Sequence, residues 1–174
     1  YEYLNMAPPD AEYLQYMYSS ELFSYVRYGK WEKILALPDV PDSLAYAKIL
    51  LEYGKGISFA RLGRHADAEL SLQKMNQLLK ENDRLKIRMG AFNTAYAGGE
   101  IAVTMLRGII AEEKNNLDEA IGLLSEAVKL EDGLIYDEPR DWLLPVRQYL
   151  ASVYIKKGYF DEAESMLRQD LRIN

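Results

Sequence analysis

The amino-acid sequence predicts an all-α protein, folded as an α-solenoid of about four helix-turn-helix units. The first observation is a helical stripe between residues 115 and 130. Apolar residues recur there at i, i+3, i+4 and i+7: Leu117, Ala120, Ile121, Leu124, Ala127 and Val128. The second observation is that the turn opening this segment occurs three more times along the chain. One helix cannot bury such a stripe alone, so units of this kind are expected to stack into a continuous core.

The recurring turn has three defining positions. Each copy begins with a residue suited to the left-handed backbone that ends a helix: Gly29, Gly63, Asn115 and Gly158. Two positions later comes a bulky residue: Trp31, His65, Leu117 and Phe160. Three positions after that comes a small or apolar residue, expected where two helices lie close: Ile34, Ala68, Ala120 and Ala163. His65 shares its position with rings and a branched chain, so it is expected to pack in the turn rather than to act in catalysis.

This pattern resembles the tetratricopeptide repeat, a helix-turn-helix unit of 34 residues. Gly29 and Gly63 are 34 residues apart (63 − 29), and Gly56 and Gly108 fit the preceding helix of two units. The chain is similar in particular to bacterial tetratricopeptide-repeat proteins of undefined biochemical role. The similar stretches are residues 27–35, residues 53–56 with Gly63 and Arg64, and residues 136–148. The resemblance covers nearly the whole chain, implies further repeats upstream, and supplies no catalytic residues.

A single domain over residues 1–174 is expected, with units at approximately 10–37, 43–80, 97–131 and 139–172. In the first unit, a helix is expected to begin at Asp10, a good N-cap, and to run to Gly29. The second helix of that unit is short because Pro38 and Pro41 follow it. In the second unit, Ser43 caps or precedes a helix that runs to residue 62, and its partner spans about 66–80.

The second half of the chain begins with residues 81–99, which predict an irregular insert containing several glycines. A helix is expected from Glu100 to about Lys114, followed by the helix of residues 115–130. A connector then leads to a helix that starts at Pro139, with Pro145 in its first turns, where a missing N–H is tolerated. The adjacent carboxylates are expected to cap that helix: Asp137 and Glu138. The last helix spans about 161–171.

Composition excludes several classes of function. The chain is 49% apolar and 28% charged, which is ordinary for a soluble globular protein. A formal net charge of −6 and a pI near 5.0 disfavour nucleic acid as a partner. No apolar run approaches the roughly 18 residues of a transmembrane helix, so no membrane insertion is expected. With no cysteine, one histidine and no glycine-rich phosphate loop, no metal, cofactor or enzymatic activity is expected.

The family resemblance implies a concave groove lined by the first helix of each unit. The candidate groove residues are aromatic or aliphatic with few charges: Tyr16, Ser19, Phe23, Leu50, Tyr53, Ile57, Met105, Ile109, Gln148, Tyr149 and Ser152. An open groove of this kind fits a protein or peptide partner with apolar anchors. It lacks the lysine and asparagine set with which some family members clamp a C-terminal carboxylate. The alternative is that neighbouring helices cover this surface.

A second candidate site is a hot spot formed by Trp142, Arg140 and Arg147, expected within two turns of one helix. Tryptophan and arginine are the side chains most enriched in binding hot spots. The alternative is structural: Trp142 packs on the preceding unit. In that case Arg147 pairs with one of the nearby acidic residues: Asp137, Glu138 or Asp141.

Two functions follow from these expectations. The favoured one is a non-catalytic scaffold within a longer repeat protein, binding a protein or peptide and offering its terminal repeats for self-association. The alternative is an accessory C-terminal repeat segment of a larger enzyme whose active site lies upstream. The chain begins at Tyr1 rather than Met, so we interpret it as a segment of a longer protein. Nothing in the sequence distinguishes bacterial cytoplasm from periplasm.

Overall fold

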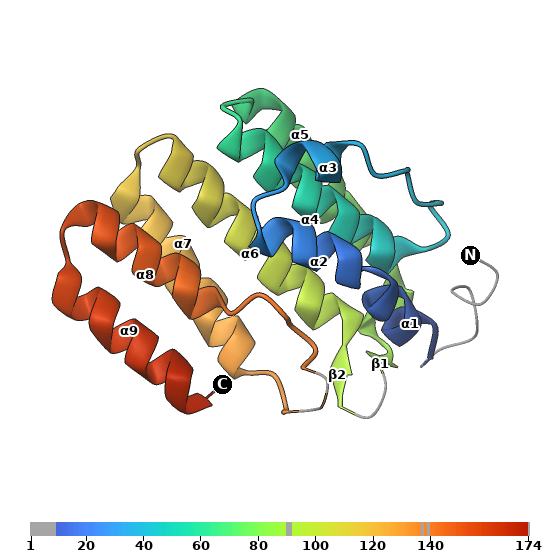
Figure 1. The fold of residues 1–174 in the computed structure, drawn as a ribbon. Helices are drawn as coiled ribbons and strands as arrows, with labels where there is room; N and C mark the ends of the chain where they lie inside the picture. The colour runs from blue at the N-terminus through green and yellow to red at the C-terminus, as the bar shows by residue number, and fades with distance from the viewer. Residues whose placement is uncertain (1–9, 90–91, 137, 139, 174) are drawn as a thin grey trace.

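The computed structural model describes residues 10–89, 92–136, 138 and 140–173. These residues are mainly helical, which confirms the predicted all-α class (Figure 1). The elements are α1 (Asp10–Tyr18), α2 (Ser20–Arg27), α3 (Trp31–Leu35), α4 (Ala45–Arg61), α5 (His65–Glu81), the 3₁₀ turn η2 (Asp83–Lys86), β1 (Arg88–Met89), β2 (Asn93–Thr94), α6 (Ala95–Glu113), α7 (Leu117–Asp132), α8 (Val146–Lys157) and α9 (Phe160–Ile173).

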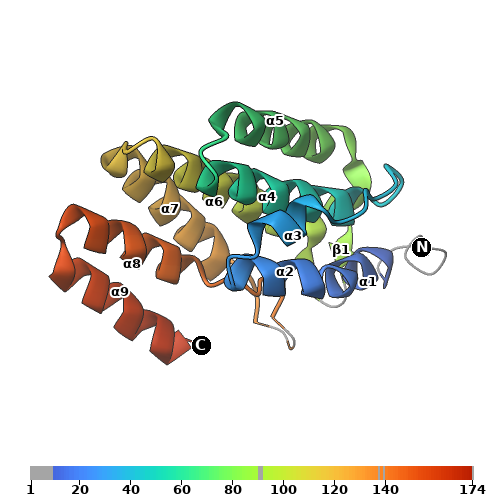
Figure 2. The same ribbon diagram turned by 45° about the horizontal axis from the view of Figure 1, so that its top comes forward.

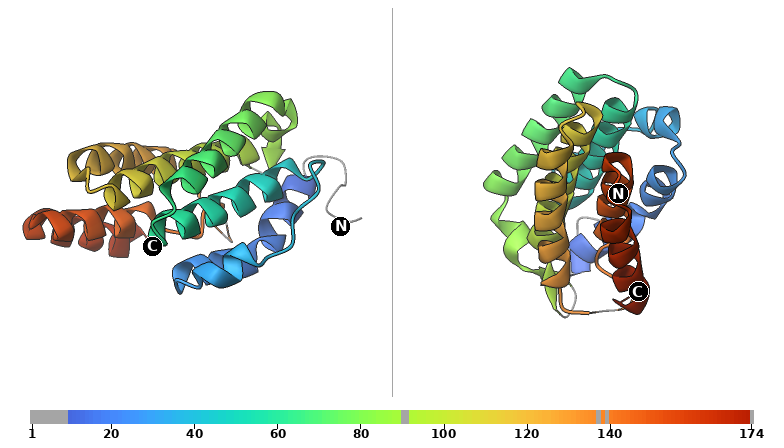
Figure 3. Two further views of the ribbon diagram at one scale, coloured as in Figure 1. Left: turned by 90° about the horizontal axis from the view of Figure 1, so that it is seen from above. Right: turned by 90° about the vertical axis from the view of Figure 1, so that its left-hand side faces the viewer.

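Successive helices pair as antiparallel hairpins: α4 with α5, α6 with α7, and α8 with α9 (Figure 2). Helices α4 and α6 also pack on each other at the centre of the molecule. The view from above shows α1–α3 and α8–α9 on the same side of this central pair (Figure 3). The end of α2 therefore comes close to the start of α8, and Arg27 Nη1 donates a hydrogen bond of 3.3 Å to Gln148 Oε1.

Four turns share one backbone geometry, as the sequence pattern predicts. The left-handed residues are those expected, with φ of 62° at Gly29, 74° at Gly63, 61° at Asn115 and 82° at Gly158. In each turn the next residue donates its N–H to the carbonyl five positions earlier, over 2.8 to 2.9 Å: Lys30 to Tyr25, Arg64 to Phe59, Asn116 to Ala111 and Tyr159 to Tyr154. This bond defines the Schellman motif, which satisfies carbonyls left open at a helix end.

The small residues of the pattern lie where the helices meet. Ala68, Ala120 and Ala163 are buried. A Cβ added at Gly56 would meet the Leu106 side chain of α6, and one at Gly108 would meet the Leu124 side chain of α7. The close approach of α6 to α4 therefore depends on Gly56, and its close approach to α7 depends on Gly108.

The helix predicted over 10–29 is in fact two helices, α1 and α2, separated at Ser19. The Ser19 hydroxyl donates to the Gln15 carbonyl at 2.9 Å, and such back-bonding commonly bends helices. The bend lets Gln15 reach the start of α4, where its Oε1 accepts the N–H groups of Tyr46 and Ala47 at 3.1 Å each. Gln15 thus caps α4, and Ser43, which was predicted to cap or precede this helix, precedes it. The Asp10 side chain, predicted as the first cap, lies outside the described side chains.

The region 81–99 is more ordered than the predicted insert. Helix α5 continues to Glu81, and after η2 the strands β1 and β2 pair antiparallel, with Arg88 opposite Thr94 and Met89 opposite Asn93. The Thr94 hydroxyl accepts the Ala97 N–H at 3.1 Å and caps α6, which begins before the predicted Glu100. Two glycines of this region are helical: Gly98 faces Tyr46 and Gly99 faces Leu79, at close contacts with α4 and α5. Gly90 lies outside the described residues.

Two glycine-to-alanine substitutions should have opposite effects on the free energy of unfolding. A Cβ would have no atom within 4 Å at either Gly158 or Gly122, so neither change introduces a clash. Gly158→Ala should destabilise by about 1 kcal/mol because φ is positive there. Gly122→Ala, inside α7, should stabilise by roughly 0.5–1 kcal/mol. Urea denaturation of both variants measures the difference, and equal effects would contradict the left-handed turn.

Candidate functional site

The connector between α7 and α8 carries the most consequential side chain, Trp142. Its indole is only 2% exposed and meets two rings from distant helices edge-on. The ring centroids lie 5.9 Å from Phe23 on α2 and 5.5 Å from Tyr53 on α4. The indole Nε1 donates to the Leu144 carbonyl at 2.8 Å, so its polar atom is satisfied inside the core. Trp142 therefore fastens the connector onto α2 and α4.

Further hydrogen bonds hold the connector in place. The Tyr16 hydroxyl donates to the Arg140 carbonyl at 2.9 Å. Asn93 donates to the Asp141 carboxylate at 2.6 Å and to the Ile135 carbonyl at 2.7 Å, and its Oδ1 accepts the Ile135 N–H at 2.9 Å. Burial raises the pKa of Tyr16 well above its ordinary value, which keeps this hydroxyl a donor.

The connector and the neighbouring helices cover most of the predicted groove. The side chains buried in the core are Tyr16, Ser19, Phe23, Leu50, Tyr53, Ile57, Met105 and Ile109. Their prediction as the surface of an open groove is therefore corrected, in favour of the alternative that neighbours cover it. The physical reason is tertiary: Trp142 occupies the space in front of Phe23 and Tyr53.

The predicted hot spot does not form one exposed patch. Trp142 and Arg147 are both buried, and the Arg140 guanidinium lies 5.4 Å from the centroid of the Tyr136 ring. Arg147 makes a bidentate ion pair with Asp132, at 2.8 and 2.7 Å, which is not one of the three acidic residues proposed from the sequence. Those were Asp137, Glu138 and Asp141. Trp142 is a packing residue, as the structural alternative predicts. Its ring partners, however, lie on α2 and α4, in the first and second units, rather than in the unit that precedes Trp142.

Helix α8 begins at Val146, seven residues after the predicted start at Pro139. Residues 140–145 are not helical, while Asp137 and Pro139 lie outside the described residues. The capping group is Glu131 at the end of α7, whose Oε2 accepts the Val146 N–H at 3.1 Å. Burial raises the pKa of the Glu131 carboxyl to about 7, against the lowering effects of that hydrogen bond and of Arg147.

An open hollow of about 570 Å³ remains beside the covered surface. Its floor is α4, and its walls are the turn between α2 and α3 and the first half of α8. Four predicted groove residues line it: Ile57, Gln148, Tyr149 and Ser152. The remaining lining was not predicted: Val26, Arg27, Tyr28, Gly29, Trp31, Arg61 and Leu144.

Aromatic rings form much of this hollow. Tyr28 is 75% exposed at the end of α2, and Trp31 follows it across the turn. A Cβ at Gly29 would lie 3.4 Å from the Trp31 ring, so the indole lies back over the left-handed glycine. Tyr149 stands on the opposite wall; burial raises its pKa, while Arg61 and Arg27 lower it. The sequence pattern predicts Trp31 only as a turn residue, because the predicted groove runs along the first helix of each unit and Trp31 begins a second helix.

Charged groups at the floor are paired with acidic residues of α6. Arg61 Nη2 lies 3.0 Å from the buried Glu112 carboxylate, and its Nη1 pairs with Glu113. Lys156 of α8 approaches Glu112 from the other side, at 2.5 Å. Because this network joins α4, α6 and α8, it holds the floor and one wall of the hollow together. The hollow thus combines rings, two guanidinium groups and the polar ends of Gln148 and Ser152.

Comparison of the chain with models of protein families, with curated proteins and with solved structures found no match in any of the three. Among the described residues, no group of three or more metal-ligating side chains could hold a metal ion. No described helix has both the length and the apolar character needed to cross a membrane. His65 opens α5, and its buried Nδ1 has no hydrogen-bond partner in the described part of the chain.

Replacing Trp142 by alanine should cost about 3–5 kcal/mol of the free energy of unfolding, the usual range for a buried tryptophan. The matched control is Leu143→Ala, the next residue in the connector, which is exposed and should cost about 0.5 kcal/mol or less. Urea denaturation followed by circular dichroism measures both. Equal losses would mean that the connector is not anchored by the indole.

Glu131 should lower the free energy of unfolding as pH rises from about 4.5 to above 7. Its pKa is about 7 in the folded chain, above its ordinary value of 4.5. Its contribution is therefore fully present below about pH 4.5 and lost as pH rises through about 7. Glu131→Gln keeps an acceptor for the Val146 N–H without the charge, so it should gain stability relative to wild type between pH 5 and pH 8. Denaturation at both pH values tests this, and the exposed Glu126→Gln should follow the wild-type profile.

Proposed function

We propose that this chain is a tetratricopeptide-like helical-repeat scaffold that binds a segment of another protein in the hollow between α2, α4 and α8. The repeat reading is supported by the four Schellman turns with their shared hydrogen bond. It is also supported by the hairpins that succeed one another along the chain. Proteins built from stacked repeats commonly bind extended partners on the surface that the stack creates.

The observation that carries the binding role is the chemistry of the hollow. Tyr28, Trp31 and Tyr149 provide rings on both walls, and arginine stands beside them at two places. Tyrosine, tryptophan and arginine are the side chains that most often dominate binding energy at protein interfaces. The volume of about 570 Å³ is within the range that holds a ligand, and is enough for an anchor side chain with the backbone around it.

The partner that fits best is an extended peptide with one apolar or aromatic anchor. The ring faces take the anchor, while the exposed hydroxyl of Ser152 is placed for a hydrogen bond to the peptide backbone. The Gln148 amide is already held, because it accepts from Arg27 and donates to Asp170. In this proposal the role is binding, and Arg61 contributes by holding the floor of the hollow through its ion pairs with Glu112 and Glu113.

Peptides selected from a random display library against the wild-type chain should depend on the hollow. Ser152→Arg places a long side chain in the hollow and should weaken their binding at least roughly tenfold. Ser165→Arg, the same change at an exposed position of α9, should leave the affinity unchanged. Trp31 lines the hollow while Trp142 is buried, so binding should also alter the fluorescence of a Trp142→Phe variant. Selected peptides that bind both arginine variants equally would refute the assignment.

A further inference from the structure

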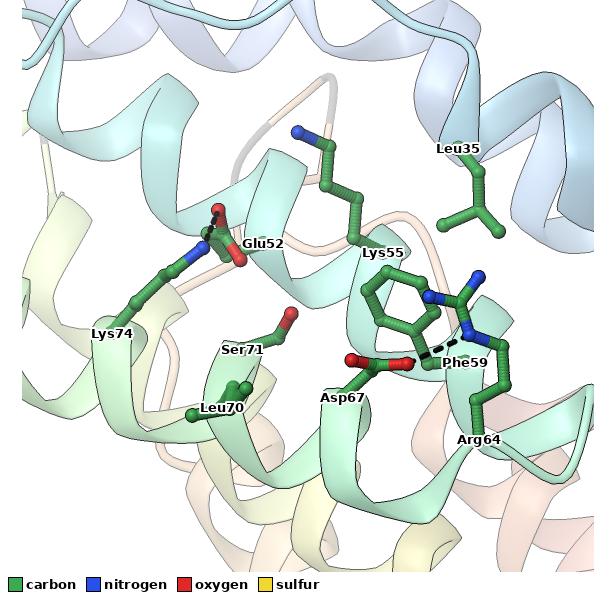
Figure 4. Close-up of a pocket in the computed structure, with 9 residues that line it drawn as sticks. All are labelled: Leu35, Glu52, Lys55, Phe59, Arg64, Asp67, Leu70, Ser71 and Lys74. Atoms are coloured by element: carbon green, nitrogen blue, oxygen red, sulfur yellow. Dashed lines mark hydrogen bonds and ion pairs between the residues drawn. The ribbon is translucent and has the colours of Figure 1, made fainter.

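A second pocket lies on the opposite face of α4, between α3 and α5 (Figure 4). It holds about 360 Å³ and is lined by Leu35, Glu52, Lys55, Phe59, Arg64, Asp67, Leu70, Ser71 and Lys74. The pocket exists because α3 has only five residues, and Pro38 prevents it from continuing over α4. This face of α4 is therefore left partly uncovered.

The inner end of the pocket holds a carboxylate that is only half satisfied. Glu52 is 2% exposed, and its Oε1 lies 3.3 Å from the Lys74 ammonium. Its Oε2 is buried and has no hydrogen-bond partner among the described residues. A buried carboxylate is costly unless it is paired and hydrogen-bonded. The Lys74 ammonium meets only one of the two carboxylate oxygens, and its side chain is 61% exposed, so it can move out into solvent and leave Glu52 to another ammonium.

The outer end of the pocket presents a guanidinium. Arg64 Nε bonds to Asp67 Oδ2 at 2.7 Å, and the guanidinium lies 4.4 Å from the centroid of the Phe59 ring. The bond to Asp67 uses only Nε, and no dashed line joins either terminal nitrogen to another of the residues drawn (Figure 4). An arginine held in this way offers its fork to a carboxylate.

We propose that this pocket binds a short peptide with free termini, two or three residues long. Its ammonium group sits on Glu52 in the place of Lys74, and its carboxylate is held by Arg64. Glu52 and Phe59 are seven residues apart on α4, which is roughly 10 Å along a helix. An extended peptide covers about 3.3–3.6 Å per residue, so two or three residues span the pocket.

The charges of the pocket favour a zwitterion over a simple ion. The lining carries three cationic side chains, Lys55, Arg64 and Lys74, and two acidic ones, Glu52 and Asp67. A simple anion would leave Glu52 Oε2 unsatisfied, and a simple amine would leave the Arg64 fork empty. A peptide with both termini free satisfies the two ends together, while the Phe59 ring and Leu70 contact its middle.

Isothermal titration calorimetry with trialanine and alanylleucine tests the proposal. Both should bind the wild-type chain, and their N-acetylated or C-amidated forms should bind at least roughly tenfold more weakly, as expected for loss of one charge-assisted hydrogen bond. Glu52→Gln should weaken binding of the free peptides by a similar factor. Lys74→Met removes the internal competitor and should tighten binding several-fold.

Matched controls separate these effects from changes in folding. Glu126→Gln and Lys80→Met make the same substitutions at exposed positions outside the pocket and should leave peptide affinity unchanged. Ser152→Arg should also have no effect, since it lies in the hollow on the other face of α4. If Glu52→Gln does not fold, the blocked peptides and Lys74→Met still decide the question. Equal binding of free and blocked peptides, or no binding at millimolar concentration, would overturn the proposal.

Discussion

The packing of Trp142 between Phe23 and Tyr53 decides which surfaces of this protein are open. The indole ties the connector before α8 to helices that precede it by about 90 residues or more in the sequence. Because the connector crosses α2 and α4 at this point, Phe23 and Tyr53 are buried in the core. The hollow between α2, α4 and α8 is the part of that surface which the connector leaves uncovered. The position of α8, and with it one wall of the hollow, depends on the same contact.

Helix starts in this fold are satisfied by side chains from elsewhere as well as by local caps. Gln15 of α1 caps α4, and Glu131 of α7 caps α8, whereas Thr94 caps α6 from the adjacent residue. The two distant caps also fix how neighbouring elements meet, since an unsatisfied N–H in the interior would be costly. Because one of these caps is a carboxylate, that junction is sensitive to pH. Burial disfavours the charged form of Glu131 and raises its pKa to about 7.

The two candidate binding sites lie on opposite faces of α4 for related reasons. The pocket beside Glu52 arises because α3 is short and leaves one face of α4 partly uncovered. The hollow arises on the other face, where the connector between α7 and α8 is not helical. The hollow is lined by aromatic rings, and we propose that it binds a segment of another protein. The pocket beside Lys55 and Glu52 is charged and fits a small zwitterion.

The amino-acid sequence by itself determined the local features: the helical class, the apolar stripes, and the four left-handed turns at Gly29, Gly63, Asn115 and Gly158. These depend on backbone conformation and on spacings within one or two turns, which are legible in a short window. The start of α8, the pairing of Arg147 with Asp132 and the burial of Tyr16 and Phe23 were decided by the tertiary structure. Each depends on contacts with residues distant in the sequence or on the path of an irregular connector, and helical periodicity carries no information about either. The candidate site was accordingly predicted in part. The residues on the first half of α8 were predicted to line a groove, whereas the opposite wall around Trp31 was not, because only the tertiary structure places that turn across from α8.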